Sequence, residues 1–247
     1  RCLLFSADQY QRRDELNPTL SDMHFIPRPF DEQEQVDWTP LWSLSAGEPR
    51  FLPTSFCYYN YHHPESGQCP SIFADSNGNA AGSTMEEAIL QGFLELAERD
   101  AVALWWYNRL SVPGCDLDSL DDPYIDRLRV YYESLQRRFW VLDVTSDLGI
   151  PTYAAVSAST AGGAEEILLG FGAHLDARLA VLRAIEEMNQ SLPHLLSWKR
   201  GQGGEMDALT AKFWRRATLA RQTYLAPSGN SLLPLRASPP PPDLKEA

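Results

Sequence analysis

The sequence predicts an α+β fold in which mixed sheets pack against helices. Strand-like and helix-like segments both occur, but they do not follow the regular strand–helix–strand repeat of an α/β protein. The chain has 247 residues with 44% hydrophobic content, which is enough to bury a core, and its 22% of charged residues is close to the usual globular value. This length fits one large domain or two small ones.

We divide the chain into three parts. Residues 1–75 form an irregular lead-in, acidic and rich in proline, which gives way to short strands after residue 51 with a turn at His62-His63-Pro64. Residues 76–200 form the core. Residues 201–247 add a helix and a tail whose prolines at 239–242 are typical of an extended or polyproline-like chain.

The central part contains the elements that the residue pattern defines best. Ser83 and Glu86 have the spacing of a capping box, which predicts a long helix from about residue 84 to residue 108. Alternating and periodic apolar residues then predict, in chain order, a helix over 122–136, strands over 139–144, 152–156 and 167–172, a helix over 177–192 that stops before Pro193, and a helix near 206–224.

Charge and cysteine content exclude several classes of protein. With 33 acidic and 21 basic residues and a formal charge of -12, the chain lacks the clustered Lys and Arg that a nucleic-acid partner requires. No apolar run reaches transmembrane length and no secretory signal is visible. The four spread cysteines favour a reducing, cytoplasmic setting. Because the chain starts at Arg1 within an apolar phrase, we expect it to be cut from a longer protein.

The long helix predicted after Ser83 carries a one-sided acidic stripe. A solvent-facing stripe is the common alternative, but such a stripe normally pairs Glu with Lys, and this helix contains no lysine. Carboxylates on a partly buried face repel one another and need a cation, and Mg²⁺ commonly joins carboxylates to phosphates. Arg99 beside the stripe could hold a phosphate. At 100° per residue four side chains fall within about 80° of one another: Glu87, Gln91, Glu95 and Glu98.

A second polar stripe lies on the helix predicted over 177–192. Arg183, Glu187 and Gln190 are spaced i, i+4, i+7 and share a face, with Asp176 on the same side just before the helix. Taken by itself, this stripe would be explained by an ordinary Arg–Glu ion pair on the protein surface. Two such stripes on otherwise apolar helices indicate that they face each other across a site.

The loop over 78–82 leads into the start of the long helix, where free N–H groups favour an anion. It matches neither a Walker loop nor G-x-G-x-x-G, and a simple turn before the helix cap explains it equally well.

These segments together resemble the YcaO family, most closely its branch that makes thiazole- and oxazole-containing ribosomal peptides. The loop from Asp75 to Ser83, Glu87 and the run Glu95-Leu96-Ala97-Glu98-Arg99-Asp100 are similar to that family's signature, and Arg183, Glu187 and Gln190 are similar to its later R-A-x-x-E-x-x-Q helix. Phrases starting at Trp38, Trp105, Leu142 and Gly170 extend the likeness over most of the chain.

The resemblance implies an incomplete YcaO-type ATP-binding fold and an ATP-dependent cyclodehydratase. In that reaction a Cys, Ser or Thr side chain of a precursor peptide attacks the preceding carbonyl, and ATP phosphorylates the resulting oxygen so that an azoline ring remains. The implied cofactors are ATP and Mg²⁺. By position, the implied nucleotide-binding residues are Ser83, Glu87, Glu95, Arg99, Arg183 and Gln190, and the implied metal ligands are Glu95, Glu98 and Glu187, with no catalytic residue assigned.

The resemblance also implies partners, and the chain departs from the family's pattern in three places. The partners are a precursor peptide, a leader-binding E1-like protein and an FMN-dependent azoline dehydrogenase, with a homodimer left open. The chain starts after the family's earlier S-x-x-x-E-x-x-E/R motif, and Ser83 stands where many relatives carry Asn. The prolines at 239–242 lie in the wrong context to be the family's distal proline motif.

Other interpretations compete with cyclodehydration. Related enzymes activate the same amide oxygen to form thioamides or amidines, and a non-catalytic docking or scaffold module is a further alternative. A zinc site is disfavoured because adjacent histidines rarely both bind one ion. We expect a structural hydrogen bond from His174 and a core position for the aromatic run at 105–107. The residues considered for zinc are Cys57, His62, His63 and Cys69, and Cys115 has no identifiable base to make it a nucleophile.

Overall fold

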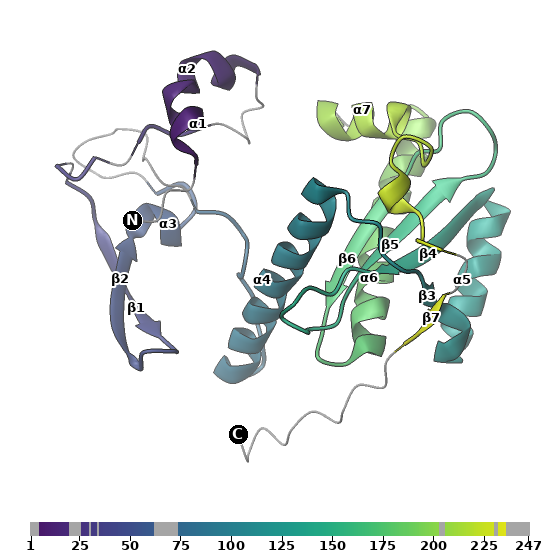
Figure 1. Cartoon of the computed structure of the whole chain (residues 1–247), viewed down its shortest axis with the longest axis horizontal. Helices are drawn as coiled ribbons and strands as arrows, with labels where there is room; N and C mark the ends of the chain where they lie inside the picture. The colour runs from purple at the N-terminus through teal and green to yellow at the C-terminus, as the bar shows by residue number, and fades with distance from the viewer. Residues whose placement is uncertain are drawn as a thin grey trace. The chain divides into compact units, whose positions relative to one another are not determined.

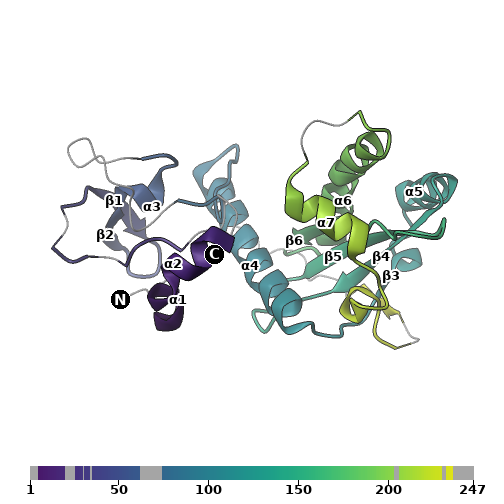
Figure 2. The same cartoon turned by 90° about the horizontal axis from the view of Figure 1, so that it is seen from above.

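The protein forms two compact units, residues 1–76 and 77–247 (Figures 1 and 2). The computed structural model describes residues 5–19, 26–29, 31–33, 35–61, 74–202, 206–229 and 232–235. The expected turn at His62-His63-Pro64 and the prolines at 239–242 lie outside these ranges.

The first unit contains more regular structure than the sequence suggested, so the prediction of an irregular segment over 1–50 is wrong. Ser6 begins a short helix because its side chain accepts from the Gln9 N–H while the Gln9 side chain accepts from the Ser6 N–H. An antiparallel hairpin follows, and the residues after it form one helical turn rather than a strand. The elements are α1 (Ala7–Gln11), α2 (Arg13–Leu16), η1 (Asn17–Thr19), β1 (Trp38–Ser43), β2 (Glu48–Pro53) and α3 (Thr54–Cys57).

The second unit is built on a three-stranded antiparallel sheet with the order β4-β5-β6. Strand β4 spans Arg137–Asp143, β5 spans Thr152–Ser159 and β6 spans Leu168–Ala173. The central strand β5 is buried along nearly its whole length. Two short strands, β3 (Cys115–Asp116) and β7 (Leu233–Pro234), pair in parallel beside this sheet. Antiparallel sheets packed with helices confirm the predicted α+β class.

Helices cover both faces of this sheet (Figure 2). Alternate residues of β5 divide between two cores: Tyr153 and Ala155 pack with α5 (Pro123–Ser134) and α6 (Ala177–Lys199). Ala154 and Val156 pack with Trp105 of α4 (Met85–Asn108). The remaining elements are η2 (Leu117–Leu120), α7 (Ala208–Arg216) and η3 (Thr223–Leu225). The sheet therefore holds α4 on one side and α6 on the other.

Two helix predictions need correction. Helix α6 does not stop before Pro193 but continues to Lys199. Pro193 costs the helix one backbone hydrogen bond, but Leu192 and Leu195 on either side of it are buried at 4% and 0% exposure, and this packing outweighs the loss. The helix expected over 206–224 ends at Arg216, where Ala217 adopts an extended conformation. None of the described helices is long and apolar enough to cross a bilayer.

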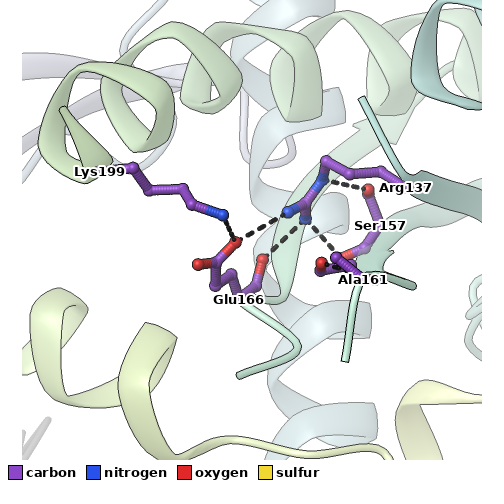
Figure 3. A network of polar contacts seen from close by, with 6 residues as sticks. Arg137, Ser157, Ala161, Glu166 and Lys199 are labelled. Carbon is purple, nitrogen blue, oxygen red and sulfur yellow. Dashed lines mark hydrogen bonds and ion pairs between the residues drawn. The ribbon is translucent and has the colours of Figure 1, made fainter. Parts of the chain in front are cut away.

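A buried ion-pair network, shown in Figure 3, joins the sheet to the end of α6. Arg137 of β4 donates to the Ser157 hydroxyl at 3.1 Å and to the Glu166 carbonyl at 2.7 Å. The Glu166 carboxylate lies 3.6 Å from the same guanidinium and 2.9 Å from the Lys199 ammonium. Because Arg137 is only 4% exposed, these partners offset the cost of burying its charge.

Candidate functional site

Helix α4 begins one residue later than the sequence indicated. Thr84 is the N-cap, and its hydroxyl accepts from the Glu87 N–H at 3.2 Å. The Glu87 carboxylate in turn accepts from the Ser83 N–H at 2.7 Å. The capping box expected from Ser83 and Glu86 is therefore wrong by one position, because Thr84 takes the extended conformation of a cap. The Glu87 carboxylate and the Thr84 hydroxyl therefore both stabilise the first turn of α4.

The loop over 78–82 lies back along α4. A side chain at Gly92 would meet the Gly78 carbonyl oxygen at 2.5 Å, and one at Gly82 would meet the Ala88 nitrogen at the same 2.5 Å. Gly78 itself has a φ of +80°, which permits the turn. Small residues at these positions allow the backbone of the loop to contact the helix. Close packing therefore explains why the loop consists of small residues.

Farther along α4, two carboxylates flank an arginine. The Arg99 guanidinium lies 3.5 Å from the Glu95 carboxylate and 3.9 Å from that of Glu98. The Glu98 side chain is the least exposed of the three at 13%, against 25% for Glu95 and 43% for Arg99. The one-sided stripe thus includes a largely covered carboxylate, which a solvent-facing stripe would not contain.

The free edge of strand β6 brings the two stripes together. Since β6 pairs only with β5 in this sheet, its alternate peptide groups point outward at Phe171 and Ala173. The Phe171 N–H donates to Glu187 of α6, and the Ala173 N–H stabilises the carboxylate of Glu98 on α4. Arg183 of α6 donates to the Ala173 carbonyl at 3.2 Å. Side chains from both helices therefore converge on one strand edge.

Two glycines in β6 allow α6 to approach this closely. A side chain at Gly170 would meet the Met188 nitrogen at 2.1 Å, and one at Gly172 would meet the Ala180 oxygen at 2.3 Å. Both distances are far below any real contact, so only glycine permits this packing. Backbone contact between α6 and β6 holds Glu187 and Arg183 against the strand edge.

The electrostatics of the site disfavour the ionised form of its two least exposed carboxylates, although Arg99 lies nearby. Burial and then the negative charge of Glu187 raise the pKa of Glu98 to about 7, although Arg99 and the Ala173 N–H oppose the rise. Burial also raises the pKa of Glu187, with the Phe171 N–H and Arg99 acting against it. Each group thus resists ionisation where it lies. A cation between them would remove this penalty.

The donor set fits Mg²⁺ bound together with phosphates. Among the described residues, no three His, Cys, Asp or Glu side chains lie close enough to form a metal cage. Mg²⁺ is usually bound through one or two carboxylates plus substrate phosphates, so it needs no such cage. Glu98 and Glu187 are placed to supply the carboxylates, and Arg99 and Arg183 could face the phosphates.

The structure does not bring all the expected site residues together. Ser83 and Glu87 lie at the start of α4, and Glu87 precedes Glu98 by three helical turns, or about 16 Å. Gln190 is exposed and has no hydrogen-bond partner in the described part of the chain. The sequence reasoning missed the β6 peptide groups, which any residue could supply. The alternating Gly170 and Gly172 were the available signal of a helix packed on that strand.

The competing sites can be assessed where the structure describes them. Cys115 is buried, and burial raises the pKa of its thiol to about 12, which excludes a reactive thiolate. The residues considered for the disfavoured zinc site, apart from Cys57, lie outside the described residues. His174 makes the expected structural hydrogen bond. Trp105 is in the core at 1% exposure, whereas the expectation for Tyr107 is wrong, since it is 82% exposed.

Comparison with known proteins identifies the family. A family profile described as "YcaO cyclodehydratase, ATP-ad Mg2+-binding" matches residues 2–247. The chain belongs to the YcaO family. ATP and Mg²⁺ are therefore the cofactors of this fold, in agreement with the donor set at the β6 edge. An uncharacterized protein from Methanothermobacter thermautotrophicus is 31% identical to this YcaO chain over 202 residues, which are 81% of this chain and 51% of that protein.

Solved structures support the same assignment. The heterocyclase TruD shares 45% identity with a TM-score of 0.81 over 95% of this YcaO chain and 32% of its own length. A heterocyclase in complex with substrate and cofactor shares 44% identity with a TM-score of 0.87, over 96% and 32%. YcaO from Methanopyrus kandleri, bound with AMPPCP and Mg²⁺, shares the fold at 23% identity and a TM-score of 0.56. The chain thus spans about half or less of each of these proteins.

Proposed function

We propose that this chain provides the Mg²⁺-ATP site of an enzyme that converts Cys, Ser or Thr of a ribosomal precursor peptide into azoline rings. One observation carries the proposal: Glu98 and Glu187, from two different helices, meet at the β6 edge with Arg99 and Arg183 beside them. The identity to heterocyclases, at 45% and 44%, favours azoline formation over other uses of the YcaO fold.

In the proposed reaction the side-chain thiol or hydroxyl adds to the preceding amide carbonyl and gives a tetrahedral adduct. The former carbonyl oxygen attacks the γ-phosphorus of ATP, and ADP leaves. The nitrogen lone pair then forms the C=N bond, the phosphorylated oxygen departs as phosphate, and the N–H proton is lost. An amide oxygen is a poor leaving group and phosphate is a good one, so phosphorylation supplies the driving force.

In this proposal each residue group has a separate task. Glu98 and Glu187 would hold Mg²⁺ together with the phosphates, with Glu95 beside them against Arg99, and the ion would offset phosphate charge during transfer. Arg99 and Arg183 contact the phosphates, and their fixed forks suit phosphate oxygens. Three residues away from the β6 edge would contact other parts of the nucleotide in this proposal: Ser83 just before α4, Glu87 in its first turn, and Gln190 on α6.

The same proposal extends to partners and setting. The precursor peptide is the substrate, a leader-binding E1-like protein presents it, and an FMN-dependent dehydrogenase oxidises the azoline afterwards. We place the reaction in the cytoplasm, where ATP is available and the cysteines stay reduced.

The test uses the full-length protein with its leader-binding partner, its precursor peptide, ATP and Mg²⁺. Wild-type protein should consume ATP and remove one water per ring from the peptide, as read by mass spectrometry. Glu187→Gln should lose at least about 100-fold of this rate, because a metal-bridging carboxylate is removed. Glu186→Gln, which changes the adjacent and exposed glutamate, is the matched control and should behave as wild type. Normal ring formation by Glu187→Gln, or exchange of oxygen for sulfur in place of water loss, would refute the proposal.

A further inference from the structure

His174 lies at the corner between strand β6 and helix α6, directly after the residue on which the site is centred. The preceding peptide group, at Ala173, interacts with Glu98 through its N–H and with Arg183 through its carbonyl. The His174 N–H donates to the Pro151 carbonyl at 3.1 Å, which fixes its backbone to the turn before β5. The imidazole therefore starts from an anchored position beside the acidic site.

The hydrogen bond made by the ring determines where its proton lies. The Asp176 N–H donates to Nδ1 of His174 at 2.9 Å. Nδ1 is thus an acceptor, so the proton of the neutral imidazole lies on Nε2. Burial, followed by the charge of Arg183, lowers the pKa of His174, which favours this neutral form. The structural bond uses one nitrogen and leaves the other as a donor.

Nε2 has no partner within the described part of the chain, and the His174 side chain is only partly buried. Arg183 uses one nitrogen for the Ala173 carbonyl, and its other N–H groups are likewise without partners among the described residues. Arg183 donates to the carbonyl of Ala173, the residue directly before His174, so its guanidinium lies at the same end of β6 as the imidazole. Together they present a neutral donor and a cationic donor at the end of the same strand edge.

We propose that His174 is a further nucleotide-binding residue, whose Nε2–H donates to the phosphate chain of ATP beside Arg183. This inference rests on the proposed function, since it assigns a ligand to the same site. A neutral donor suits this position because it binds a phosphate oxygen without needing a second buried cation so close to Arg183. His174 in this assignment binds substrate with one nitrogen and holds the β6–α6 turn with the other.

The two ring nitrogens can be tested separately in the full-length protein. The amide oxygen of Asn can take the place of Nδ1 as acceptor but cannot reach the position of Nε2. His174→Asn should therefore keep the melting temperature and raise the Kd for ATP by about tenfold, with a smaller effect on AMP. His174→Gln places an N–H near Nε2 but loses the Nδ1 acceptor. It should lower the melting temperature while ATP affinity stays within about threefold of wild type.

Calorimetric titration with ATP, ADP and AMP in the presence of Mg²⁺ measures these affinities. The melting temperature of each variant reports whether the β6–α6 turn keeps its stability. His194→Asn repeats the substitution at an exposed position of α6 and should change neither quantity. If His174→Asn binds ATP as tightly as wild type, the inference is overturned while the proposed function stands. The same holds if His174→Asn loses affinity equally for all three nucleotides and its melting temperature falls as well. Absence of ATP binding by the wild-type protein would overturn the proposed function and the inference together.

Discussion

The backbone N–H of Phe171 donates to Glu187 on α6, and two residues farther along the same edge of strand β6 the N–H of Ala173 lowers the pKa of Glu98 on α4. Each N–H favours the ionised carboxylate next to it, while burial and the neighbouring negative charge oppose ionisation. Without a bound cation, simultaneous ionisation of Glu98 and Glu187 is therefore unfavourable, and protonation of one glutamate relieves this. This balance makes the site responsive to pH and to cations.

Stability of the ligand-free protein should fall as pH rises from about 5 to 8. The pKa of Glu98 is about 7 in the folded protein against 4.5 for the free group, so the folded state binds more protons between these values. Unfolding free energy therefore decreases with pH over this window, by about 2 kcal/mol after allowing for solvent screening. Glu98→Gln should reduce this slope to the part that the raised pKa of Glu187 contributes, and should be more stable than wild type at pH 8. Denaturant melts at pH 5 and pH 8 measure both quantities, and an unchanged slope in Glu98→Gln would contradict the assignment.

Replacing Glu166 should be far more damaging than replacing Lys199. Glu166→Gln leaves the guanidinium of Arg137 buried without its counter-charge, which we expect to cost about 3 kcal/mol of unfolding free energy. Lys199→Met removes a partner whose side chain is 46% exposed, so it should cost under about 1 kcal/mol. Urea denaturation of both variants makes the comparison. Similar losses would mean that Lys199, and not Arg137, is the main partner of Glu166.

Gly172→Ala should disturb the site as well as the fold. The new methyl group would meet the Ala180 oxygen at 2.3 Å and the Ala184 nitrogen at 2.5 Å, and both atoms belong to the α6 backbone. The helix must then move away and carry Glu187 with it, so we expect a loss of about 3 kcal/mol and weaker nucleotide binding. Gly201→Ala is the control: it lies in open space with a φ of +68°, and should cost only about 1 kcal/mol. Equal effects of the two changes would show that α6 packing does not position the site.

The helix cap offers a test of the corrected start of α4. Thr84→Ala removes the acceptor for the Glu87 N–H and should cost about 1 kcal/mol. Ser83→Ala keeps the backbone N–H that donates to the Glu87 carboxylate, so it should change stability by less than about 0.5 kcal/mol. Thermal melts of the two variants distinguish the positions, and a larger effect at Ser83 would restore the cap expected from the sequence.

Helical periodicity predicted the carboxylates of α4 well because angle around the axis follows directly from residue spacing. It placed Glu95 and Glu98 together correctly. It also grouped Glu87 with them, but an angle contains no information on height along the axis, and Glu87 lies about 16 Å away at the helix start.

What the periodicity could not predict depends on tertiary packing. The site is completed by the backbone N–H groups of Phe171 and Ala173, and almost any residue type could supply such a group at these positions. Pro193 gave a strong local signal to end α6, but burial of Leu195 outweighed it. The buried pair of Arg137 and Glu166 joins residues far apart in the sequence, so no local pattern could reveal it.

Proton release on nucleotide binding tests the Mg²⁺-ATP site most directly. At pH 7 a carboxyl with a pKa of about 7 is half protonated, and Mg²⁺ binding requires its ionised form. Calorimetry with Mg²⁺ and a non-hydrolysable ATP analogue, in two buffers of different ionisation enthalpy, should detect the release of about half a proton. Glu98→Gln should bind at least about tenfold more weakly and release correspondingly less. Binding of wild type without proton release, with equal affinity in Glu98→Gln, would show that the cation and the nucleotide bind elsewhere.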